Sequence, residues 1–239
     1  MASSASPGGS LIGIRSSKRP DPPSGAPAEI SVVLPLSAGA PDPAGTVARL
    51  LAGLAGCGEP FELIVVGEGE LPSGDPRIRR APCPAGSDLG ARLLAGVRGA
   101  STDFILPALA GRAPAAGEVT MLRDAMDSSG AFSYLPGSRA ADVAIVVGAR
   151  TVFRNLVVYG LVGVFASDFA GPMLARRSLF DAVHVAGATT PEILLGIVAQ
   201  TRRAGGVVRT LRDPAPGGAR LPVPIADAWR VRARLRTGP

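Results

Sequence analysis

Residues 30–67 read ISVVLPLSAGAPDPAGTVARLLAGLAGCGEPFELIVVG, and this stretch decides the fold. The continuous β-branched run at 30–34 predicts a buried strand that ends at Pro35. Apolar residues then recur at helical spacing from 47 to 54, and a second apolar run follows at 62–66. Two such strands joined by one helix form a βαβ unit, so the stretch predicts a parallel sheet.

The alternation of strands and helices continues along the chain. It predicts a three-layer α/β domain in which a mostly parallel sheet is flanked by helices. The further elements expected are a helix capped by Ser87 or Asp88, a strand at 103–106, a helix at 116–126, a strand at 131–135, a buried helix in the second half of 141–165, a helix at 191–205 and a strand from Val207.

Composition divides the chain into three parts. Residues 1–28 are rich in Ser, Pro and Gly without periodicity, which predicts a disordered leader. Residues 29–212 carry the alternating pattern and form the predicted domain. Residues 213–239 form a basic C-terminal tail.

Charge and cysteine content exclude several classes of protein. The net charge is +6, but aromatic residues make up only 4%, so little is present for nucleic-acid bases to stack on, and nucleic acid is not an expected partner. Cys57, Cys83 and the single His184 lack the spacing of a zinc site. The apolar stretches at 11–14 and 156–166 are too short for a signal peptide and for a transmembrane helix. We therefore expect a cytoplasmic protein.

Several segments, in order, resemble the nucleotide-sugar-binding half of family 2 glycosyltransferases, especially the polyprenyl-phosphate sugar synthases. The segments are ISVVLPLSAG at 30–39, FELIVVGEGE at 61–70, SDLGARLLAGVRGASTDFIL at 87–106, GSR at 137–139 and SDFAGPMLARRSLFDAV at 167–183. The resemblance implies a GT-A-like (Rossmann-like) fold, a nucleotide-sugar donor and a lipid-phosphate acceptor. It also implies a divalent metal ion against the donor diphosphate.

The sequence departs from the family pattern at the motifs that bind the metal ion and the nucleotide-sugar donor. The family's Asp-x-Asp window is Ala-Leu-Ala-Gly at 108–111, and no carboxylate lies between Phe104 and Gly117. Ala38-Gly39 stands where Asn-Glu is usual, and Gly67-Glu68 replaces Asp-Asp. We therefore predict no metal ligand set and no cofactor.

The resemblance assigns roles to six residues, each with a structural alternative. Glu68 either contacts the nucleotide or is a solvated loop carboxylate, and Asp168 is either a general base near the acceptor or a turn residue bonded to backbone amides. The arginines either hold phosphates or form surface ion pairs. The candidates for nucleotide or phosphate contacts are Pro35, Ser37, Glu68, Arg139 and Arg176, and the candidate catalytic residue is Asp168.

Two functions remain open at this point. In the first, the protein is a glycosyltransferase in which Arg139 and neighbouring arginines stabilise the leaving diphosphate instead of a metal. In the second, it is a non-catalytic relative that binds and regulates a protein partner.

The tail IADAWRVRARLRTGP, residues 225–239, is amphipathic in two conformations. As a strand it places its four arginines opposite Trp229 and Val231, whereas as a helix it pairs 230 with 234 and 232 with 236. Either form suits an anionic membrane surface, such as the inner face of the cell membrane, and a solvated basic tail is the alternative.

Overall fold

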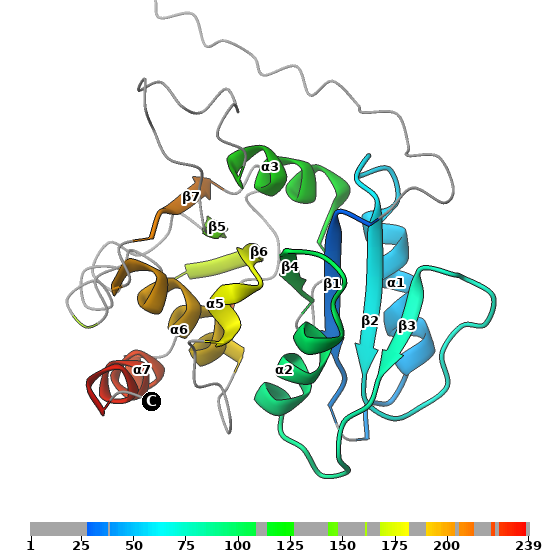
Figure 1. Cartoon of the computed structure of the whole chain (residues 1–239), viewed down its shortest axis with the longest axis horizontal. Helices are drawn as coiled ribbons and strands as arrows, with labels where there is room; N and C mark the ends of the chain where they lie inside the picture. Colours follow the sequence, from blue (N-terminus) through cyan, green and yellow to red (C-terminus); the bar gives the residue numbers. More distant parts are fainter. Residues whose placement is uncertain are drawn as a thin grey trace, which may run out of the picture.

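The computed structural model describes residues 28–37, 39–108, 114–126, 143–147, 161, 168–181, 190–203, 206–212, 221–222 and 225–237. Within them the strands form one eight-stranded sheet in the order β3-β2-β1-β4-β6-β5-β7, with β8 paired to β6 (Figure 1). The strands are β1 Ile30–Pro35, β2 Phe61–Val66, β3 Ile78–Ala81, β4 Phe104–Pro107, β5 Val143–Val147, β6 Asp168–Arg176, β7 Val208–Arg212 and β8 Leu221–Pro222. The helices are α1 Pro43–Leu54, α2 Leu89–Gly99, α3 Ala116–Met126, α5 Ser178–Asp181, α6 Thr190–Arg203 and α7 Ile225–Thr237.

Four parallel strands, β1 to β4, form one side of the sheet. β1 pairs in parallel with β2 on one side and with β4 on the other, and β3 extends the set beyond β2. The antiparallel strand β6 joins β4 to β5. We call the edge where β1 to β4 end the carboxyl edge, and the opposite edge the amino edge. The predicted mostly parallel sheet is confirmed.

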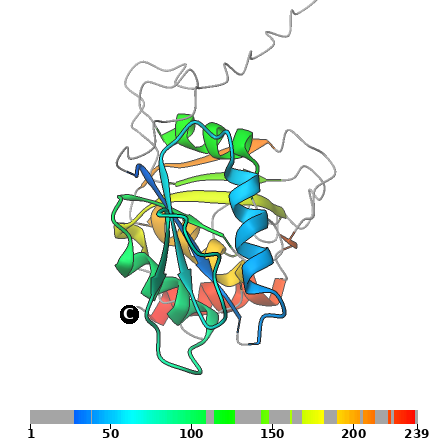
Figure 2. The same cartoon turned by 90° about the vertical axis from the view of Figure 1, so that its right-hand side faces the viewer.

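Helices cover both faces of the sheet, because side chains of a strand point alternately to either face. Val32 and Leu34 of β1 pack with α1 and α3, whereas Val33 packs with α2. The core cluster that contains Val33 and α2 also contains side chains of α5, α6 and α7. Figure 1 shows α7 beside α6 and far from α1, and Figure 2 views the molecule with α1 in front of the sheet. The three-layer prediction is therefore confirmed.

Local signals account for the helix starts. Asp88 is the N-cap of α2, where its carboxylate accepts the Ala91 amide at 2.7 Å. Asp42 caps α1 in the same way through Gly45, at 2.8 Å.

The strands β3, β5, β6 and β8 were not predicted from the sequence. β3 has only four residues, two of them exposed, so its apolar pattern is weak. β6 contains Gly171 and Pro172, residues that interrupt a strand pattern. Arg176 ends β6, and Arg177 lies in the turn after it.

Other predictions fall where the structure is not described. These are the leader apart from Ala28, the strand at 131–135 and, apart from Leu161, the helix in the second half of 141–165.

Beyond residue 212 the chain contributes β8 and α7. β8 pairs with β6, and Ala228 and Val231 of α7 are buried in the core that includes α6. Of the two conformations that the sequence left open for residues 225–237, the structure has the helix.

Candidate functional site

The carboxyl edge has a switch point between β1 and β4, because the chain leaves β1 toward β2 and later returns to the other side of β1. Open α/β sheets bind ligands in the crevice at such a point. Here the backbone is tied on both sides: the Leu36 amide donates to the Val66 carbonyl, and the Ala108 amide donates to the Val33 carbonyl, each at 2.8 Å. The chain after β1 is thus fixed to β2, and the chain after β4 is fixed to β1.

A small hollow of ≈ 140 Å³ opens at this edge beside the ends of β2 and β3. Glu68 is exposed at its rim and forms no hydrogen bond or ion pair within the described part of the chain. The carboxylate is therefore available to a ligand. The lining residues are Gly67, Glu68, Arg80, Ala81, Pro82, Cys83, Pro84 and Arg92.

Arg92 of α2 forms the floor of the hollow. It is only 4% exposed, and its Nε donates to the Ser87 carbonyl at 3.0 Å while the guanidinium also donates to the Leu36 carbonyl. Over the described ranges, no carboxylate lies within ion-pair distance of it. A buried charge without a counterion is costly, and two carbonyls offset this cost only in part. An anionic group in the hollow would supply the missing charge.

A second cation and a tight backbone complete the hollow. Arg80 of β3 is exposed and donates to the Gly69 carbonyl. Gly67 has φ +143°, and a Cβ there would lie 2.9 Å from Leu36 Cβ and 3.4 Å from a terminal nitrogen of Arg92. Only glycine lets the end of β2 pass this close to Leu36. This packing gives a reason for glycine where the family pattern has an aspartate.

The structure brings three of the predicted site residues to the carboxyl edge. Pro35 is the buried last residue of β1, Ser37 is exposed two residues later, and Glu68 lies at the neighbouring strand end. Asp168 is the first residue of β6; because β6 runs antiparallel to β4, it starts on the same side. Arg139 lies outside the described residues.

Arg176 is not near these residues. It pairs with Phe104 across the strands at the amino edge, where its guanidinium bonds Asp103 at 2.8 Å and lies 5.4 Å from the Phe104 ring centre. The sheet therefore separates Arg176 from Pro35 and Glu68.

Sequence reasoning missed Arg92. An arginine in the first turns of a helix usually extends into solvent, and no family motif pointed to it. The available signal was its position three residues after Leu89 and four before Gly96, which places it on the helix face that packs against the sheet.

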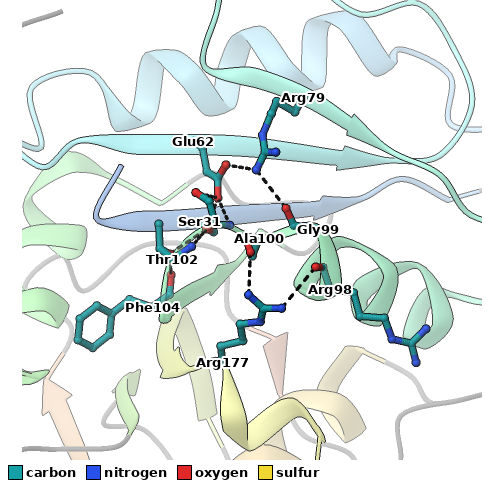
Figure 3. Close-up of polar contacts among 10 residues, drawn as sticks. Ser31, Glu62, Arg79, Arg98, Gly99, Ala100, Thr102, Phe104 and Arg177 are labelled. Atoms are coloured by element: carbon teal, nitrogen blue, oxygen red, sulfur yellow. Dashed lines mark hydrogen bonds and ion pairs between the residues drawn. The ribbon is translucent and has the colours of Figure 1, made fainter. Parts of the chain in front are cut away.

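The amino edge carries a polar network that acts as a structural anchor (Figure 3). The Glu62 carboxylate is 7% exposed and accepts hydrogen bonds from Ser31 Oγ at 2.5 Å, from the Ser101 amide at 2.7 Å and from the Arg79 guanidinium. Burial raises the pKa of Glu62, but the hydrogen bonds outweigh it and hold the pKa below its ordinary value. Arg177 donates to the Ala100 carbonyl at 2.8 Å and so caps the end of α2.

The residues at the carboxyl edge do not fit the divalent ion that the fold suggests. Within the described ranges, no three His, Cys, Asp or Glu side chains gather as a ligand set. The loop after β4 adds none by sequence, since no carboxylate lies between Phe104 and Gly117. Hard divalent cations need oxygen ligands, and this loop offers no carboxylate to bind one.

Together the sheet order and the two helical layers define a GT-A-like α/β fold. The structure is similar to glucosyl-3-phosphoglycerate synthase from Mycobacterium tuberculosis solved with Mn²⁺, UDP-glucose and phosphoglyceric acid, at 15% identity over 88% of this chain and 78% of that chain, with TM-score 0.53. With UDP alone, the same enzyme matches at 14% identity over 87% and 81% of the chains, with TM-score 0.51. A structure described only as a mycobacterial protein matches at 18% identity over 88% and 73%, with TM-score 0.52.

No protein-family model matches the chain, and no curated protein matches its sequence. At identities this low, the structural likeness establishes the fold, and the predicted GT-A-like architecture is confirmed. Among the described residues, none of the helices has the length and apolarity needed to cross a membrane.

Proposed function

We propose that this protein is a glycosyltransferase-like protein that binds a nucleotide-activated sugar at the carboxyl edge. The observation that carries the proposal is that Arg92, which is buried and has no carboxylate partner in the described part of the chain, lines a hollow beside the ends of β2 and β3. A nucleoside diphosphate supplies the missing negative charge, and the free Glu68 carboxylate at the rim can accept hydrogen bonds from a ribose or base edge. The similar structures that contain UDP or UDP-glucose support this choice of ligand.

For sugar transfer, we propose that arginines carry out the electrostatic role that a metal has in the family. The bond between the anomeric carbon and the diphosphate breaks, and negative charge grows on the leaving diphosphate. Guanidinium groups held at that point stabilise this charge. Arg80 and Arg92 lie at the hollow, and Arg139 is the further candidate that the family resemblance names.

The proposed acceptor carries a phosphate. The resemblance suggests a polyprenyl phosphate, and the similar synthase was solved with phosphoglyceric acid, which is also a phosphomonoester. A phosphate oxygen attacks as an anion and needs no base, whereas a hydroxyl acceptor needs one to take its proton. The start of Asp168 on the carboxyl side of the sheet makes it the proposed base for the second case.

The two cysteines provide a direct test of ligand binding. Cys83 is half-buried and lines the hollow, whereas Cys57 is 3% exposed in the core. A maleimide should therefore label Cys83 selectively, and a ligand in the hollow should slow the labelling. We would measure the rate with UDP-, GDP- and dTDP-sugars, with and without Mn²⁺, beside thermal shift, since a ligand that binds the native state stabilises it. The variant Cys83→Ser shows which signal belongs to Cys83.

Slower labelling and a raised melting temperature with one nucleotide, independent of Mn²⁺, is the expected result. If no nucleotide protects Cys83 or shifts the melting temperature, the proposal is wrong. That outcome would favour a second candidate function, a non-catalytic relative that binds a protein partner. The lack of any carboxylate between Phe104 and Gly117 is the observation that favours this alternative.

A further inference from the structure

Three arginines of helix α7 have described side chains, and two of them bond buried carboxylates. Arg230 bonds both Glu192 of α6 and Asp227, and Arg234 lies 3.7 Å from Glu192. The Glu192 and Asp227 side chains are 1% and 4% exposed, so Arg230 and Arg234 neutralise buried carboxylates. Together with the buried Ala228 and Val231, these pairs fix α7 on α6 and fix which of its faces points outward.

The outward face of α7 is both apolar and cationic. Ile225 and Trp229, one helical turn apart, are 39% and 56% exposed and are the exposed large hydrophobic residues of the described chain. Arg232 lies 5.6 Å from the Trp229 ring centre and forms no ion pair within the described residues. The only acidic residue of the helix, Asp227, is buried. This face therefore presents an indole, an aliphatic side chain and a free cation, without negative charge.

We propose that this outward face of α7 is a docking surface for an anionic phospholipid bilayer. Tryptophan prefers the interfacial region of a membrane, and arginine is attracted to anionic headgroups. The net charge of +6 adds long-range attraction to a negative surface. Binding is peripheral, and it is sensitive to salt because the charged contribution is screened. This inference does not depend on the nucleotide site, which lies at the end of other elements.

The chain contains a built-in reporter for this contact. Trp229 is its only tryptophan, so fluorescence emission reports on α7 alone. The full-length protein would be mixed with phosphatidylglycerol-containing vesicles and with pure phosphatidylcholine vesicles at about 0.15 M salt. We expect co-sedimentation, a blue shift of the emission and protection from a soluble quencher with the anionic vesicles only.

Two matched variants locate the contact. Arg232→Gln removes the charge beside Trp229 and should weaken binding about fivefold, equivalent to about 1 kcal/mol. Arg49→Gln removes the same charge from α1, on the opposite face of the sheet, where the side chain is 67% exposed, and should bind as the unchanged protein does.

Four outcomes overturn the proposal. The first is a lack of binding to anionic vesicles, and the second is equal binding to neutral ones. The third is an equal loss in Arg232→Gln and Arg49→Gln, which would reflect net charge alone. The fourth is an emission shift that follows protein concentration without lipid, because that result would assign the face to a second copy of the chain.

Discussion

Replacing Arg92 with methionine should separate ligand binding from stability. The substitution keeps most of the side-chain volume and removes the cation. It leaves the Leu36 and Ser87 carbonyls without their donors, which costs about 1 to 3 kcal/mol for a buried acceptor. It also removes a 4%-exposed charge that has no described counterion, and relief of that desolvation cost is of similar size. We therefore expect the free energy of unfolding to change by less than about 2 kcal/mol.

Ligand affinity should respond much more strongly. A hydrogen bond from a guanidinium to a phosphate or other acceptor contributes about 1.5 to 3 kcal/mol, so Kd for UDP-glucose should rise about 10- to 150-fold. Titration calorimetry measures this affinity, and urea unfolding measures stability. Arg98→Met is the matched control, because Arg98 is exposed near the other end of the same helix.

Two results would refute the reasoning. If Arg92→Met binds UDP-glucose as tightly as Arg98→Met does, the Arg92 guanidinium does not contact the ligand. If Arg92→Met unfolds the protein while Arg98→Met does not, Arg92 has a structural role that its carbonyl contacts alone explain.

Three other substitutions test neighbouring parts of the structure. Glu68→Ala should weaken nucleotide binding by about 1 to 3 kcal/mol without changing the melting temperature, and unchanged affinity would mean that Glu68 is only solvated. Glu62→Gln should lower the free energy of unfolding at neutral pH. Because the folded-state pKa of Glu62 lies below 4.5, the stability difference between the two proteins should be complete above pH 4.5 and should disappear as the pH falls through the folded-state pKa, which unfolding measured as a function of pH would show. Gly67→Ala should lower the free energy of unfolding by about 3 kcal/mol or more, and Gly74→Ala by about 1 to 2 kcal/mol, because both glycines have positive φ but, of the two, only position 67 lacks room for a Cβ. Equal decreases in the free energy of unfolding, measured by chemical denaturation, would contradict this reasoning.

The sequence predicted the elements that are buried on both faces. The strand runs at 32–34 and 63–66 are continuous and apolar, so their pattern stands out against the helical spacing between them. β3 and β6 lack this contrast. β3 is short and half exposed, and β6 contains a glycine and a proline, so their positions depend on pairing with distant strands.

The candidate site was predicted only in part for a similar reason. Pro35, Ser37 and Glu68 follow strand ends, and the carboxyl ends of parallel strands meet at one edge, so their shared position follows from local patterns. Arg176 belongs to the unpredicted strand β6, whose antiparallel direction takes its last residue to the amino edge. The contacts of Arg92 with distant carbonyls are tertiary, and no local pattern encodes them.

In the proposed function, the anchors at the two ends of α2 would hold the Arg92 charge in place. Electrostatic stabilisation is effective when the charge is held in place before the ligand arrives. Asp88 caps the first turn of α2, and Arg92 itself bonds the loop after β1. At the other end, Arg177 caps the last carbonyls, and Glu62 holds the following turn through the Ser101 amide. The amino-edge network, although it lies away from the hollow, therefore restricts the helix that carries the cation, and weakening it should loosen the Arg92 position before it unfolds the sheet.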